Sequence, residues 1–105
     1  MSIFDIFIAY VSWGHNGKSR PVLIIKQLED SVVVFSITTQ FDNKSDLMRS
    51  KYFQINDWKQ AGLDKQSYID TNTTVTLPIS SVNTKKPVGI LTESDIQKLI
   101  EFLTK

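Results

Sequence analysis

Short runs of β-branched and aromatic residues, separated by turn-forming residues, fill most of this chain and constrain its fold more than any other feature. Such runs favour strands, because branched and aromatic side chains pack well on a pleated surface. The expected strands span residues 3–11, 22–26, 31–39, 51–55, 66–69, 73–78 and 88–91. Many short strands of this kind predict a small, strongly curved sheet or barrel.

The last part of the chain has helical spacing instead. Thr92 is a favourable N-cap with Asp95 three residues later, close to a capping box. The expected helix runs to about Leu103, and its buried stripe is predicted to consist of Ile96, Leu99, Ile100 and Leu103. A mainly β (α+β) fold with a C-terminal helix follows. Between the strands we expect a flexible loop at 12–18, a polar loop at 41–50 and one helical turn at 57–61, ended by Gly62.

Composition limits the functions open to the chain. Its 105 residues, 41% of them hydrophobic and 22% charged, predict one globular domain, 1–105. No apolar run has the length of a membrane span, and no signal peptide opens the sequence, so a cytoplasmic protein is expected. The absence of cysteine excludes thiol nucleophiles and cysteine-based zinc sites. No motif for a metal or cofactor is present, and a net charge of +1 disfavours broad binding to duplexes.

One polar pair stands out against this background. Arg20-Pro21 precedes one apolar run, and Thr38 and Thr39 close another, so a guanidinium and hydroxyls fall at the ends of neighbouring predicted strands. Arginine holds a phosphate through two parallel charged hydrogen bonds, and a threonine hydroxyl can donate a third. His15 is the one histidine, and histidine ordinarily titrates near neutral pH. These residues favour chemistry centred on a phosphate.

The ordered motifs at 18–25 (KSRPVLII), 36–40 (SITTQ), 67–71 (SYIDT) and 88–95 (VGILTESD) resemble the MazF/PemK toxins of type II toxin–antitoxin pairs. The resemblance covers almost the whole chain. It implies an SH3-like β-barrel, usually paired as a homodimer, and a cognate antitoxin with an acidic, largely disordered tail. It also implies a metal-independent endoribonuclease that cuts single-stranded RNA at selected sequences, leaving a 2′,3′-cyclic phosphate and a 5′-hydroxyl.

The resemblance also suggests roles for individual residues. It implies that Arg20 is the central catalytic residue, that Thr38 orients or stabilises the phosphate oxygens, and that Asp70 is a base or contacts the substrate. His15 is a further acid or base candidate on chemical grounds. The assignment of acid and base among these four residues stays open. The candidates for RNA binding are Trp13, Lys18, Thr39, Gln40 and Lys51.

The chain departs from the family pattern downstream. Tyr68 stands where some members carry a second arginine, and the stretch at 71–74 (TNTT) lacks another arginine that is usual there. These changes motivate an alternative function, namely a barrel-shaped module that binds RNA or protein without cutting.

Overall fold

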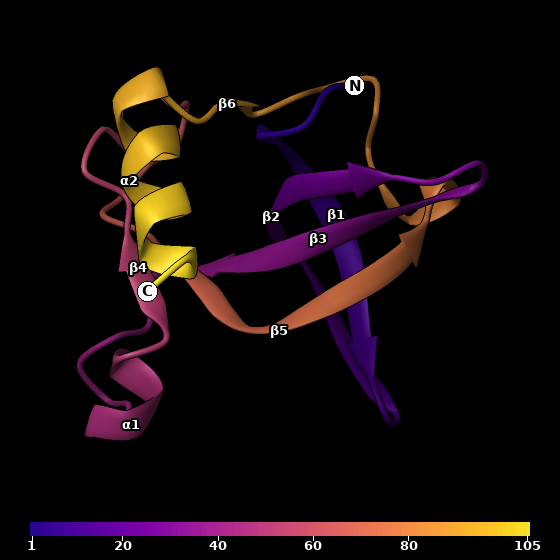
Figure 1. Cartoon of the computed structure of the whole chain (residues 1–105). Helices are drawn as coiled ribbons and strands as arrows, with labels where there is room; N and C mark the ends of the chain where they lie inside the picture. The colour runs from indigo at the N-terminus through magenta and orange to yellow at the C-terminus, as the bar shows by residue number, and fades with distance from the viewer.

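The apolar runs form strands, as their β-branched composition predicts, and these strands pair into one antiparallel sheet. The computed structural model describes the backbone of all 105 residues and every side chain except that of Trp13. The elements, shown in Figure 1, are β1 (Asp5–Trp13), β2 (Asn16–Gln27), β3 (Ser31–Thr38), α1 (Asp46–Arg49), β4 (Tyr52–Gln54), β5 (Tyr68–Pro78), a 3₁₀ turn (Ile79–Ser81), β6 (Gly89–Ile90) and α2 (Glu93–Leu103).

The described strands are hydrogen-bonded in the order β4-β5-β3-β2-β1-β6, and each neighbouring pair is antiparallel. The sheet curls strongly, with α2 standing beside β4 at one end (Figure 1). The mainly β prediction with a C-terminal helix is therefore confirmed, in the form of a curled half-barrel. No helix of the described chain is long and apolar enough to cross a membrane.

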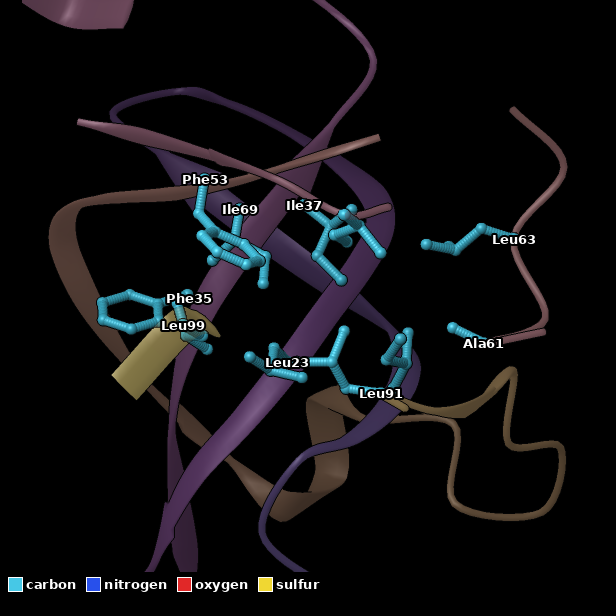
Figure 2. Packing of buried hydrophobic residues seen from close by; sticks show 11 residues of the cluster. Leu23, Phe35, Ile37, Phe53, Ala61, Leu63, Ile69, Leu91 and Leu99 are labelled. Carbon is cyan, nitrogen blue, oxygen red and sulfur yellow. The ribbon is translucent and has the colours of Figure 1, made fainter. Parts of the chain in front are cut away.

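Both faces of the sheet are covered by apolar side chains. Leu23 and Phe35, paired across β2 and β3, belong to one cluster together with Leu99 of α2. Figure 2 shows side chains of this cluster converging from the strands, the 61–63 loop and α2. Phe7 of β1 and Leu77 of β5 belong to a second cluster although β2 and β3 separate their strands. The curl of the sheet brings these two strands together.

The loop predicted at 12–18 is wrong, because the sheet continues through it. Val11 pairs with Lys18, and the pairing extends outward to Trp13 and Asn16. Only residues 14 and 15 form the turn, and the φ of +57° at Gly14 is the backbone conformation that two-residue hairpin turns need. β1 and β2 thus form a long hairpin arm that projects from the sheet (Figure 1).

The helix begins where the sequence predicts, but it faces the sheet differently. Thr92 is the N-cap, and its side chain accepts a hydrogen bond from the N–H of Asp95. Asp95 and Leu99 are fully buried, whereas Ile100 is 48% exposed and Leu103 is 46% exposed. The predicted stripe was therefore half wrong. Hydrophobic periodicity cannot detect a buried carboxylate, and Asp95 takes a position toward the core.

Two smaller differences concern the middle of the chain. The expected polar loop contains the short helix α1, capped by Ser45, whose side chain accepts a hydrogen bond from Met48 N. The two strands expected at 66–69 and 73–78 form one strand, β5, with a shift of register between Asp70 and Val75. In this irregular stretch both the N–H and the hydroxyl of Thr71 donate to the carbonyl oxygen of Lys51.

Candidate functional site

Arg20 and Thr38 lie on neighbouring strands and share a face of the sheet. Val22 of β2 pairs with Ser36 of β3. Because alternate residues of a strand point to the same side, Arg20 shares the face of Val22, and Thr38 shares the face of Ser36. Both residues are half-buried, and the Nε atom of Arg20 is shielded from solvent. A guanidinium and a hydroxyl therefore stand together where the apolar face becomes polar.

The hydroxyl of Thr38 is oriented by the chain that follows it. Its Oγ1 accepts a hydrogen bond from the backbone N–H of Gln40 at 3.0 Å. A hydroxyl carries one proton to donate in addition to its acceptor lone pairs. Thr38, the last residue of β3, can thus be held as an acceptor and still donate to a ligand at the rim of the sheet.

Asp70 joins the same face from β5. It pairs with Ser36 of β3 on one side and with Tyr52 of β4 on the other. One carboxylate oxygen accepts a hydrogen bond from the N–H of Asn72 at 2.9 Å, and the residue remains half-buried. The adjacent strands β2, β3 and β5 therefore present a guanidinium, a hydroxyl and a carboxylate on one face.

The pKa of Tyr52 is affected by both Asp70 and Arg20. The pKa of Tyr52 is raised, first by burial and then by the carboxylate of Asp70, while the guanidinium of Arg20 opposes the rise. A phenol with a raised pKa stays protonated at neutral pH, so Tyr52 adds a hydrogen-bond donor next to Asp70. Sequence reasoning missed Tyr52, since its position opposite Asp70 depends on the strand register.

An open pocket of about 230 Å³ lies at this end of the sheet. Its lining includes five of the residues predicted from the sequence and four others. The nine lining residues are Lys18, Ser19, Arg20, Pro21, Ile37, Thr38, Thr39, Gln40 and Ser67. Ser67 is buried and its hydroxyl donates to the carbonyl oxygen of Lys65 at 2.8 Å, so it shapes the wall. Its place in the motif at 67–71 was the available signal.

Aromatic side chains gather near the end of β3, whose last residue, Thr38, lines this pocket. Tyr68, which pairs with Thr38, stacks on Phe41 with ring centroids 4.3 Å apart. Phe41 also contacts Tyr52 at 6.3 Å between centroids, and the guanidinium carbon of Arg49 lies 5.7 Å from the centroid of the Phe41 ring. The position at which some family members carry an arginine is thus occupied here by part of an aromatic stack, with Arg49 of α1 over its outer ring.

The structure does not bring every predicted residue to this pocket. His15 is exposed in the turn of the hairpin arm, five residues along β2 from Arg20, which corresponds to about 16 Å of strand. Asp70 shares the face of Arg20 but does not line this pocket. Lys51 lines a different pocket, between the 50–51 turn, β5 and the end of α2. The side chain of Trp13 lies outside the described part of the chain, so its predicted base contact stays a prediction. Within the described residues, no group of three His, Cys, Asp or Glu side chains could hold a metal ion.

The order of strands, the terminal helix and the polar rim define a small, mainly β protein with a polar site at one end of its sheet. Residues 3–105 match the family model described as PemK-like, MazF-like toxin of type II toxin-antitoxin system. The chain therefore belongs to this family of toxins. Membership implies an antitoxin as partner.

A solved structure supports the fold. The chain is similar to the Mycobacterium tuberculosis toxin MazF-mt6, with a TM-score of 0.72 and 24% sequence identity, over 94% of this chain and 91% of that chain. At this identity the likeness concerns the fold alone. No curated protein matches the sequence.

Proposed function

We propose that the protein is a metal-independent endoribonuclease that cuts single-stranded RNA at selected sequences and leaves 2′,3′-cyclic phosphate and 5′-hydroxyl ends. One observation carries the proposal: Arg20, Thr38 and Asp70 share one face of three adjacent strands, and Arg20 and Thr38 also line an open pocket. Membership of the toxin family supports it. Single-stranded RNA suits the reaction, because an unpaired backbone can adopt the in-line geometry and unpaired bases expose their edges.

Arg20 and Thr38 bind the reacting phosphate in this proposal. During attack by the 2′-oxygen, negative charge grows on the non-bridging phosphate oxygens, and donors placed there lower the barrier. The planar guanidinium of Arg20 donates two parallel charged hydrogen bonds. The hydroxyl of Thr38, oriented by Gln40, donates another. Lys18, Thr39 and Gln40 also line the pocket and contact the RNA around the cut.

Asp70 accepts the proton of the 2′-hydroxyl, since carboxylates serve as general bases. The 2′-oxygen then forms a bond to phosphorus, the bond from phosphorus to the 5′-oxygen breaks, and the leaving 5′-oxygen takes up a proton. Tyr52, which pairs with Asp70 across β4 and β5, stays protonated and provides a polar group near the carboxylate. His15 remains an alternative acid or base only if the hairpin arm bends toward the site.

The partners follow from the same proposal. A cognate antitoxin blocks the pocket with an acidic segment that is disordered when free and folds on binding. Lys18 and Arg20 at the pocket provide the complementary charge. We further propose that the protein acts in the cytoplasm, as a homodimer of single-domain chains.

Cleavage of a long single-stranded RNA in EDTA tests the proposal, with the fragment ends mapped. We expect discrete cuts by the wild type and a loss of at least about 10²-fold in Arg20→Ala, the effect of removing one transition-state donor. Arg20→Lys keeps the charge but loses the paired hydrogen bonds, so we expect it to remain strongly impaired. Lys26→Ala, which removes an exposed cation from the same strand, is the matched control.

The outcome separates the enzyme from the alternative. Intact RNA over a wide range of enzyme and substrates, with RNA binding retained, would favour the module that binds without cutting. The Phe41–Tyr68 stack, in place of an arginine, is the structural observation in favour of that module. Cleavage unchanged in Arg20→Ala would contradict the assignment of Arg20.

A further inference from the structure

A second pocket, of about 300 Å³, adjoins the first. Its wall is made from the sheet rim on one side and from the 62–67 loop with Val88 on the other. The nine lining residues are Ile8, Pro21, Thr39, Gly62, Leu63, Asp64, Lys65, Ser67 and Val88. Pro21, Thr39 and Ser67 line both pockets, so the two form one continuous groove.

The chemistry of the second pocket differs from that of the first. Ile8, Pro21 and Leu63 give it apolar walls, while the carboxylate of Asp64 and the ammonium group of Lys65 are exposed at its edge. A carboxylate repels a phosphate but accepts hydrogen bonds from N–H groups. The combination suits a flat ring with apolar faces and a polar edge, which describes a nucleobase.

The wall that carries Asp64 is held firmly in place. A Cβ at Gly62 would lie 2.1 Å from the carbonyl oxygen of Val88, and one at Gly89 would lie 2.1 Å from the carbonyl oxygen of Ala61. The two backbones therefore touch at a distance that only glycine allows. Because the loop is anchored here, the pocket is formed before a ligand arrives, which lowers the entropic cost of binding.

A second anchor lies in the turn that precedes this loop. The carboxylate of Asp95 accepts hydrogen bonds from the N–H groups of Asn56 at 3.2 Å and Asp57 at 2.8 Å. The hydroxyl of Thr92 donates to the carboxylate of Asp57 at 2.9 Å. These bonds tie the 56–61 turn to the first turn of α2, so the segment that leads into the 62–67 loop is fixed as well.

We infer that this pocket binds a base of the RNA next to the cut phosphate, and that Asp64 makes it selective for guanine. The inference rests on the proposed function. Guanine presents two adjacent donors, N1–H and N2–H₂, on its Watson–Crick edge, which match the two oxygens of a carboxylate. Uracil, cytosine and adenine each present a single donor group on that edge, so only guanine forms the paired contact.

Binding of RNA that cannot be cut tests the inference. The probes are fluorescent heptamers with 2′-O-methyl groups throughout, one of uridines only and seven with a single guanine at successive positions. A matching series carries adenine instead. Anisotropy gives the Kd of the wild type, of Asp64→Asn and of Asp30→Asn, a matched control at an exposed aspartate of the β2–β3 turn. Circular dichroism verifies that both variants fold.

We expect guanine at one position to tighten wild-type binding by about 10-fold or more over uridine or adenine there, because a paired contact discriminates between bases by about this factor. Asp64→Asn should reduce this preference to less than about 3-fold and leave the all-uridine Kd little changed, while Asp30→Asn keeps the preference. A wild type without base preference, or an Asp64→Asn variant that retains it, would overturn the inference.

The experiment keeps the two proposals apart. Because the probes lack a reactive 2′-hydroxyl, base selection is measured even for a protein that never cuts RNA. Conversely, cleavage that depends on Arg20 but whose cut sequence is the same in Asp64→Asn would leave the nuclease standing and remove the guanine pocket. A wild type that does not cut RNA but still selects guanine would remove the nuclease and leave the guanine pocket standing.

Discussion

Two carboxylates of this protein lie in opposite surroundings, although backbone N–H groups bind both. Asp95 is fully buried at the start of α2 and accepts hydrogen bonds from Asn56 and Asp57. Asp70 is half-buried at an open end of the sheet and accepts one from Asn72. Asp95 thus joins two segments of the chain, whereas Asp70 keeps surface that a ligand can reach.

The comparison shows that burial of a charge does not by itself mark a functional site. A buried carboxylate is tolerated when its oxygens are hydrogen-bonded, and the first turn of a helix also favours negative charge. Asp95 meets both conditions with groups of its own fold. Asp70 instead shares its face of the sheet with the guanidinium of Arg20 and the hydroxyl of Thr38. This grouping of different polar side chains, and not burial, marks a candidate reaction site.

The largest expected effect separates the two carboxylates directly. Asp95→Ala leaves two backbone N–H groups without an acceptor, each costing about 1–3 kcal/mol, so we expect the free energy of unfolding to fall by about 3 kcal/mol. The Tm should drop by about 15 °C for a domain of this size. Urea and thermal unfolding measure both quantities.

The matched change at the site is Asp70→Asn. It should alter the free energy of unfolding by less than about 1 kcal/mol and reduce RNA cleavage by about 10²-fold or more, as expected when a general base is removed. If the two variants lost stability equally, the contrast between a structural and a functional carboxylate would be wrong.

A smaller effect concerns the phenol of Tyr52, whose pKa responds to both Asp70 and Arg20. The difference in ultraviolet absorbance between wild type and Tyr52→Phe gives the ionisation of Tyr52, and its pKa should lie above the ordinary tyrosine value. In Arg20→Ala this pKa should rise further, and in Asp70→Asn it should fall. Shifts of the opposite sign would contradict the common placement of the three side chains.

The same titration has a consequence for stability. The folded pKa of Tyr52 lies above that of the unfolded chain, so in alkali the unfolded state releases this proton first. The contribution of Tyr52 is complete below the unfolded pKa and is lost as the pH rises through the folded value. Tyr52→Phe should therefore show a shallower loss of stability with pH in strongly alkaline urea titrations.

The smallest effect is expected at the tip of the hairpin arm. Because His15 is exposed and about five residues along the strand from Arg20, His15→Gln should change the cleavage rate by less than about twofold, against the 10²–10⁴-fold expected for a general acid or base. The pH–rate profile should keep its shape. A loss near 10²-fold would show that the arm bends toward the site.

Local chemistry made part of the fold predictable. The runs of Val, Ile and Phe around β2 and β3 predicted strands, and Thr92 predicted the start of α2, because each of these features acts within a few residues. Arg20 and Thr38 were predictable as a pair for the same reason. Each stands at a boundary between apolar and polar sequence.

Features that depend on register were not predictable. The glycines around His15 suggested a loop, yet pairing of Val11 with Lys18 continues the hairpin, because one glycine is enough for the turn. The position of Tyr52 opposite Asp70 requires the alignment of β4 with β5. The exposure of Ile100 followed from the burial of Asp95, whose partners lie far away in the sequence.

The close approach of the backbones at Gly62 and Gly89 also affects when the groove is formed during synthesis. The 62–67 loop leaves the ribosome before Val88, Gly89 and the start of α2, which hold it in place. A nascent chain that has already exposed Arg20, Thr38 and Asp70 therefore still lacks the contacts that fix one wall of its groove. The groove is therefore completed only when the last elements of the chain have folded.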